Sequence, residues 1–187
     1  MRILFRIIRK CRVLLYGALS TNKPSYKGKR LQPVLFLGKG NVKIGENTIF
    51  GYYPSALFFS SYCHIEARHS DANIIIGSNN FFNNCFSIVA DHGNVIIGDD
   101  CLVGANVSII NSDFHPIRVK DRHTTKYSCK DVVIGNNVFI GSRVSIMKGV
   151  NIGDNAVIAN GAVVFDNVEP NTIVRGNPAK IYKEIYE

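Results

Sequence analysis

A six-residue repeat runs through the chain from Val132 to Val168. One position of each hexad holds a large aliphatic residue: Ile134, Ile140, Ile146, Ile152, Ile158 and Val164. Four residues further on stands a smaller one: Val138, Val144, Val150, Ala156, Ala162 and Val168. A helix would space apolar residues by 3.6, and an ordinary strand would alternate them by twos. A strict period of six instead predicts a three-sided prism, in which each hexad is one short strand plus a corner of a parallel β-helix.

The same phase recurs upstream of residue 132. The large inward positions are Ile44, Phe50, Ile76, Phe82, Ile88, Ile97, Val103 and Ile109. Asn and Asp gather after the glycines of the repeat, as in Asn136–Asn137 and Asp154–Asn155, which suits tight corners because these residues tolerate left-handed backbone. Cys101 falls in a small inward position and is predicted to lie in the core.

The repeat is interrupted once, by residues 111–131. This stretch is polar and carries no apolar pattern. A solenoid does not need such an excursion for stability, and long loops of this kind usually serve function. It begins with Asn111-Ser112-Asp113-Phe114-His115-Pro116-Ile117. We therefore expect the functional site at this loop.

The chain resembles the hexapeptide-repeat acyltransferases. The resemblance rests on the order of its features: the repeat, then the loop with its His-Pro pair, then the segments IGNNVFIGSRVSIMKGVNIGDNAVIANGAVV and RGNPAKIYKEI. More narrowly, the chain resembles the maltose, galactoside and polysaccharide O-acetyltransferase branch, over about residues 40–185. The resemblance implies an all-β, left-handed parallel β-helix. The handedness comes from the resemblance alone, since crossovers are usually right-handed.

Three parts of the chain are expected. Residues 1–39 form a basic amphipathic segment and lead-in, residues 40–170 the β-helix with its loop at 111–131, and residues 171–187 a C-terminal cap with a short helix. The five cysteines are scattered without a CxxC pair, which argues against a disulfide framework or a thiolate zinc site. A bacterial cytoplasmic protein is expected.

The formal net charge of +8 comes from the N-terminal part, because no Asp or Glu precedes Glu46. Bases and aliphatic residues interleave in residues 1–16, which predicts a helix to about Tyr16 that ends near Gly17 and Pro24. The apolar run is far below the ~20 residues of a spanning helix. This helix either contacts an anionic membrane surface peripherally or packs on the first coils or a neighbouring subunit. Nucleic acid is disfavoured because no stacking aromatics accompany the bases.

His115 is the predicted catalytic residue. The resemblance places the catalytic histidine of this branch directly before a proline in such a loop, as in His115–Pro116. Acyl transfer from a thioester to a sugar hydroxyl needs a base for the hydroxyl proton, and a neutral imidazole suits that task. The thioester is already activated, so we expect direct attack without an acyl-enzyme. Asn84 stands where the branch often carries an asparagine of the acceptor site.

The resemblance also implies acetyl-CoA as co-substrate, no metal, and a homotrimer whose active sites lie between subunits. Phe139 would line the pantetheine channel, backbone near Gly141 and Ser142 would hold the thioester oxygen, and Asn160–Gly161 would bond the pantetheine amides. The candidate cations for the CoA phosphates are Lys148, Arg175, Lys180 and Lys183. The candidate residues for binding the acceptor are Asp113, His92 and His123.

Zinc is the main question raised by the other histidines, because a carbonic anhydrase class shares this fold and binds metal through three histidines. His64 and His69 imitate part of such a site, but no third histidine lies about two coils earlier.

The favoured function is an acetyl-CoA-dependent O-acetyltransferase for a sugar hydroxyl, in a surface-polysaccharide precursor or a lipid-linked glycan. The alternatives are an N-acetyltransferase for an amino-sugar nucleotide, a zinc-dependent β-helix hydratase, and a catalytically silent scaffold.

Overall fold

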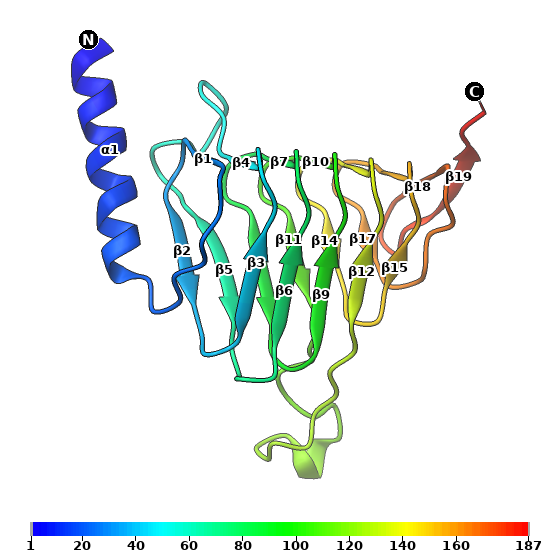
Figure 1. Cartoon of the computed structure of the whole chain (residues 1–187). Helices are drawn as coiled ribbons and strands as arrows, with labels where there is room; N and C mark the ends of the chain where they lie inside the picture. Colours follow the sequence, from blue (N-terminus) through cyan, green and yellow to red (C-terminus); the bar gives the residue numbers. More distant parts are fainter. Residues whose placement is uncertain (1, 187) are drawn as a thin grey trace.

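The computed structural model describes residues 2–186; Met1 of the basic segment and Glu187 of the C-terminal part lie outside the described residues. The chain winds into a parallel β-helix with a helix at its N-terminal end and two projecting loops, residues 51–62 and the longer 111–131 (Figure 1). The six-residue period therefore predicted the architecture.

Three sheets form the faces of the prism. Sheet A contains β1 (Lys29–Arg30), β4 (Ile49–Phe50), β7 (Phe81–Phe82), β10 (Leu102–Val103), β13 (Phe139–Ile140), β16 (Val157–Ile158), β18 (Thr172–Arg175) and β19 (Lys180–Glu184). Sheet B contains β2 (Val34–Leu37), β5 (Cys63–Ala67), β8 (Ser87–Ala90), β11 (Ser108–Ile110), β14 (Ser145–Ile146) and β17 (Val163–Val164). Sheet C contains β3 (Asn41–Ile44), β6 (Asn73–Ile76), β9 (Asn94–Ile97), β12 (Val132–Ile134) and β15 (Asn151–Ile152).

The core is a set of side-chain columns that run along the prism. Ile109 pairs in register with Ile88 on one side and Ile146 on the other, so equivalent hexad positions stack from coil to coil. All the predicted large inward residues are buried, and Cys101 is buried with them. Burial raises the pKa of the Cys101 thiol to about 11, which marks it as an inert core residue.

The corners between sheet C and sheet A hold the predicted Asn and Asp residues. Asn137 and Asn155 have φ of 54° and 60°, the left-handed backbone that their type tolerates. Their side chains join along the corner, with Nδ2 of Asn137 donating to Oδ1 of Asn155 at 2.8 Å. The corner prediction is confirmed.

Helix α1 (Arg2–Leu19) continues past the predicted end near Gly17 and lies against β2 at the N-terminal end of the prism (Figure 1). Within residues 2–186, no helix has both the length and the apolarity to cross a bilayer.

The predicted C-terminal helix is wrong. Residues 180–184 form β19, which pairs antiparallel with β18 at the end of sheet A. Gly176 has a φ of +96°, a conformation that favours glycine and turns the chain back on itself. The last parallel strand would otherwise leave its backbone groups unpaired, and the returning strand covers that edge.

Candidate functional site

Two edges of the prism carry the predicted site residues. Edge AB, the set of turns from sheet A to sheet B, includes residues 83–86, 141–144 and 159–162. Edge BC, the set of turns from sheet B to sheet C, includes residues 68–72, 91–93 and the long loop 111–131. Within one chain, the His115 loop and the Ser142 turn therefore lie on different edges.

The loop 111–131 is fastened where it leaves the prism. Ser112 and Cys129 form an isolated antiparallel bridge, and the backbone of Asp113 donates to the carbonyl of Ser128 at 3.1 Å. The carboxylate of Asp113 forms an ion pair with Lys148 of the next coil. Beyond this closed base the loop holds only a 3-10 turn, η1 (Val119–Asp121). His115 thus stands at the ordered root of the loop.

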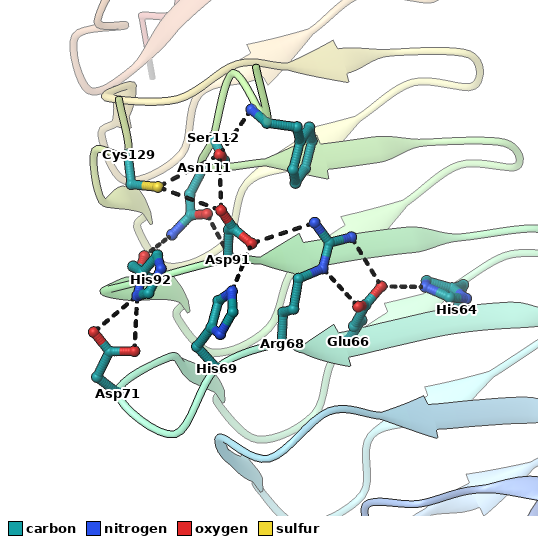
Figure 2. Close-up of polar contacts among 11 residues, drawn as sticks. His64, Glu66, Arg68, His69, Asp71, Asp91, His92, Asn111, Ser112 and Cys129 are labelled. Carbon is teal, nitrogen blue, oxygen red and sulfur yellow. Dashed lines mark hydrogen bonds and ion pairs between the residues drawn. The ribbon is translucent and has the colours of Figure 1, made fainter. Parts of the chain in front are cut away.

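A buried carboxylate, Asp91, is the centre of the polar contacts at edge BC (Figure 2). Its Oδ1 lies 3.2 Å from Nη1 of Arg68, and its Oδ2 accepts a hydrogen bond from Ser112 Oγ at 3.1 Å. Arg68 Nε also donates to Glu66 at 2.8 Å, so the guanidinium bridges two carboxylates. Cys129 Sγ lies 3.7 Å from Asp91 Oδ2. These contacts make Asp91 a fixed, desolvated anion.

The electrostatics keep Asp91 ionised. Burial by itself raises the pKa of the Asp91 carboxyl, but hydrogen bonds from Tyr127 and Ser112 lower it. The nearby charges of Arg68 and His69 act in the same direction, and the pKa lies below its ordinary value.

His115 follows directly on this cluster. The ring of Phe114 lies under the Arg68 guanidinium at 4.8 Å, and the Phe114 N–H donates to Ser112 Oγ at 2.9 Å. Phe114 has a φ of 58°, an uncommon conformation for a bulky residue. Its contacts hold this backbone, and the next residue, His115, is exposed. The structure thus presents an accessible histidine one residue after a side chain that packs on Arg68.

The acceptor candidates have varied surroundings. Asp113 accepts a backbone hydrogen bond from His115 N–H at 2.7 Å, while its carboxylate pairs with Lys148; it does not orient the imidazole. His92 bonds Asp71 through Nδ1 at 2.9 Å. His123 lies exposed, far along the loop past η1. His92 therefore lies near Asp91, whereas His123 is not part of this group of polar residues.

Asn84 lies on edge AB and does not reach the His115 loop within the chain. Its side chain is fully buried, with Nδ2 donating to the carbonyls of Tyr52 and Ala56 at 2.9 and 2.8 Å. Its Oδ1 accepts from the Tyr52 N–H at 3.0 Å. These bonds hold the 51–62 turn, so within the chain the buried amide of Asn84 has a structural role, and its catalytic role stays a prediction.

The turns expected to bind the thioester also lie on edge AB. The Ser142 N–H donates to Oδ1 of Asn160 at 2.6 Å, so the amide assigned to the thioester oxygen is engaged inside the chain. Asn160 and Gly161 are exposed, and a Cβ on Gly161 would meet nothing within 4 Å. Phe139 is half exposed on sheet A, whereas Gly141 is buried. The turn at Asn160 and Gly161 is thus exposed, and a ligand that bonded the Ser142 N–H would have to displace Asn160.

The cations expected at the CoA phosphates are divided among other contacts. Lys148 is corrected, because it pairs with Asp113 in the loop root. Lys180 lies 3.1 Å from Asp166, and Arg175 stacks on Tyr182 at 3.7 Å from the ring centroid. Lys183 is exposed on β19. The hairpin of β18 and β19 therefore presents exposed cations beside sheet A.

One group within residues 2–186 has the composition of a metal site: His69, Asp91 and His92, with potential ligand atoms within 4.8 Å of one another. The two imidazoles are stacked, 4.2 Å between centroids and 6° between planes. A metal binds an imidazole nitrogen in the ring plane at about 2.0–2.1 Å. One ion cannot lie in two parallel stacked planes, so these rings do not converge on a metal. His64 is paired with Glu66 instead, at 3.2 Å.

Sequence reasoning missed Asp91, Arg68 and Ser112 as a group. Ala67 pairs with Ala90, and Val89 pairs with Ile110, so the residues that follow stack in one column along edge BC. The coils that separate the three residues differ in length, so the six-residue repeat by itself gave no signal for this column.

Comparison with known proteins agrees with this geometry. Residues 131–166 match the family model of the bacterial transferase hexapeptide (six repeats), and residues 94–122 match the hexapeptide repeat of succinyl-transferase. The galactoside O-acetyltransferase of Escherichia coli (strain K12) is 40% identical over 114 residues, which are 61% of this chain and 55% of that protein. Over these residues the chain is similar to hexapeptide-repeat acetyltransferases. Because it spans about half the length of this relative, its own activity is a matter for proposal.

Solved hexapeptide-repeat acetyltransferases share the fold, a left-handed β-helix. The polySia-specific acetyltransferase NeuO aligns with a TM-score of 0.62 at 26% identity, over 88% of each chain. The hexapeptide-repeat acetyltransferase of Vibrio cholerae O1 biovar eltor, solved with acetyl-CoA, aligns with a TM-score of 0.60 at 23% identity, over 98% of this chain and 84% of its own.

Proposed function

We propose that this hexapeptide-repeat protein is an acetyl-CoA-dependent O-acetyltransferase that acts on a sugar hydroxyl, with His115 as general base. The observation that carries the proposal is the position of His115. It is exposed at the fastened root of the loop 111–131, directly after Phe114, whose ring packs on the Arg68 that pairs with buried Asp91. The similarity to hexapeptide-repeat acetyltransferases supports acetyl transfer, and the relative named for galactosides supports a sugar acceptor.

In the proposed reaction, the neutral imidazole of His115 removes the proton of the acceptor hydroxyl as its oxygen attacks the thioester carbonyl. A tetrahedral intermediate forms and collapses, the carbon–sulfur bond breaks, and the thiolate of CoA leaves. The protonated imidazole returns its proton to that sulfur. Arg68, which is partly exposed and held in place by the buried Asp91, orients acceptor hydroxyls, since a charged, preorganised group binds them at little reorganisation cost.

We further propose a homotrimer with sites shared between subunits. Edge BC carries His115, and edge AB carries the open turn of Ser142 and Gly161. A three-fold arrangement about an axis parallel to the prism would set edge BC of one subunit against edge AB of the next. Each shared site would then take His115 from one chain and the CoA channel, with Phe139 and the exposed cations, from its neighbour.

The proposed acceptor is a precursor of a surface polysaccharide, in the free or lipid-linked form. The similarity to a polysialic-acid-specific acetyltransferase supports a polymeric or acidic glycan. We place the reaction in the bacterial cytoplasm, with the enzyme peripheral to the inner membrane.

The decisive experiment compares His115→Ala and His115→Gln with the unchanged protein, using acetyl-CoA and a panel of glycans. Loss of a general base should lower kcat by about 10²–10⁴-fold while CoA binding is kept. Thr125→Ala, an exposed change in the same loop, is the control and should keep full activity. Wild-type turnover by His115→Ala with its acceptor would refute the mechanism.

The same preparation separates the alternatives. An O-acetyl product loses its acetyl group in mild base, whereas the amide made by an amino-sugar N-acetyltransferase survives. One equivalent of bound zinc together with CO₂ hydration would support the hydratase instead. The absence of product from every acceptor, with no CoA binding, would favour a silent scaffold.

A further inference from the structure

Helix α1 has an apolar stripe that its own chain leaves exposed. Residues on this stripe are 41–74% exposed: Ile3, Leu4, Ile7, Ile8, Leu14, Leu15 and Leu19. Their spacing follows one side of the helix, at i, i+1, i+4 and i+5 from Ile3, and resumes three turns later at Leu14. Large apolar residues gathered in this way on a surface mark an interaction site.

A different side of α1 docks the helix on the prism. Phe5 packs against Tyr53, Phe58 and Phe59, with ring centroids 4.5–5.9 Å apart. Arg12 donates two hydrogen bonds to backbone carbonyls of the 51–62 turn, at 2.8 and 2.6 Å. The helix is therefore held in place by one side while the stripe faces away. Packing on the first coils, one of the two expected roles, explains the side of the helix that carries Phe5 and Arg12 but not the exposed stripe.

The stripe is extended by the turn against which Phe5 packs. Tyr53, Leu57 and Phe59 remain 41–52% exposed there. Tyrosine and phenylalanine are residues that favour the boundary between headgroups and acyl chains. Helix α1 lies at the N-terminal end of the prism (Figure 1), and the exposed apolar residues of the 51–62 turn adjoin it through Phe5.

A basic pocket adjoins the stripe. Its volume is about 280 Å³, and it is lined by Arg9, Lys10, Val13 and Leu14 of α1 and by Arg30 of β1. The ion pairs found within residues 2–186 include none of its three cations. Leu14 belongs to both the pocket and the stripe. Unpaired cations above apolar side chains fit a phosphate that is joined to a hydrocarbon chain.

We propose that this surface binds an anionic lipid bilayer, with the basic pocket of Arg9, Lys10 and Arg30 holding a headgroup phosphate. The stripe enters the interface without spanning it. Each base near an anionic leaflet contributes about 1 kcal/mol. The purpose of this contact rests on the proposed function: binding to the bilayer would keep the active site beside lipid-linked acceptors. In a trimer, all three helices would lie at one end and bind together.

Charge argues for lipid over a second copy of the chain. No acid precedes Glu46, so a symmetric contact through this surface would bring the cations of both copies together without a carboxylate from either α1. An anionic leaflet supplies the missing opposite charge.

The test is flotation of the full chain with vesicles of phosphatidylglycerol and phosphatidylcholine, compared with phosphatidylcholine alone. Binding should require the anionic lipid and fall at least tenfold in Leu14→Gln/Leu15→Gln. Gln has nearly the helix propensity of Leu, so the helix should persist. Val119→Gln, an apolar residue 78% exposed on the long loop, is the matched control and should bind normally.

The pocket is tested by Arg9→Gln/Lys10→Gln/Arg30→Gln against Lys39→Gln/Lys43→Gln/Lys126→Gln, which lowers the net charge equally. Only the pocket variant should lose flotation. If both variants lost flotation equally, net charge would be the cause, and the proposed headgroup site in the pocket would be wrong. The proposal that this surface binds lipid would be wrong if the intact chain failed to float. It would also be wrong if the Leu14/Leu15 variant lost its oligomeric state in light scattering. Flotation needs no acetyl transfer, so this result stands apart from that of the His115 experiment.

Discussion

At the scale of residues, the site depends on one arginine placed between two acids. Arg68 contacts Asp91, whose side chain is 0% exposed, and Glu66, which is 18% exposed. The hydrogen bond from Arg68 is the largest cause of the lowered pKa of Glu66. The pKa of Asp91 is also below its ordinary value of 3.8. Both carboxylates therefore add stability that is present above their unfolded pKa values and is lost as the pH falls through the folded ones.

Arg68→Met should destabilise the protein by about 2–4 kcal/mol at pH 7, because a buried carboxylate loses its partner. The figure is below that of a fully buried pair, since Arg68 is 38% exposed. The difference from the unchanged protein should shrink as the pH falls below 4.5 and 3.8, the ordinary pKa values of the two carboxyls, towards their lower folded values. Urea unfolding at pH 7 and at about pH 3 measures it. A loss that does not depend on pH would contradict the electrostatic explanation; Lys27→Met, in an exposed pair, is the control.

At the scale of elements, strands of two residues cannot hold a coil together by themselves, and buried polar residues at the corners complete the bonding. Asn80 is an example on the turn from β6 to β7. Its Nδ2 donates to the Gly98 carbonyl at 2.8 Å, and its Oδ1 accepts from the Cys101 N–H at 2.8 Å. One side chain thus satisfies two backbone groups of the next coil.

Asn80→Ala should lower the free energy of unfolding by about 2–4 kcal/mol, because both backbone groups would lose their partner away from water. Asn41→Ala, at an exposed position of β3, is the matched change and should cost little. Thermal and urea unfolding compare the two. Equal effects would mean that the buried bonds of Asn80 add nothing beyond those of a surface asparagine.

At the scale of the whole molecule, the separation of the two edges makes a clear prediction for subunit mixing. His115→Ala removes the base on edge BC, and Asn160→Trp fills the proposed CoA channel on edge AB. Each variant alone should be inactive. If every site joins one edge from each of two subunits, random trimers of both variants should recover about a quarter of the wild-type activity.

Co-expression of differently tagged chains, followed by light scattering and a turnover assay, measures this recovery. An active monomer, or mixed trimers without activity, would contradict the shared site. The prediction also requires that Asn160→Trp alone forms trimers, which the same light scattering checks.

The sequence by itself determined the β-helix and placed its core. A six-residue period is a local property: each hexad sends Ile134 or Ile140 inward whatever the rest of the chain does. The loop and His115 were also predictable, because they interrupt that period. Counting hexads along the sequence predicts which turns share an edge of the prism. That the His115 loop and the Ser142 turn lie on different edges follows once each turn is assigned to a pair of sheets.

Only the tertiary structure decided which polar residues meet. The coils between Arg68, Asp91 and Ser112 differ in length, so their column depends on the register of whole strands and not on the repeat. The sequence of β19 was compatible with a helix, and the free edge of sheet A made it a strand. Helix α1 had apolar residues on most sides, and contact with the 51–62 turn determined which of them were buried. Local periodicity sets the inward residues of each element; contacts between elements far apart in sequence set the site.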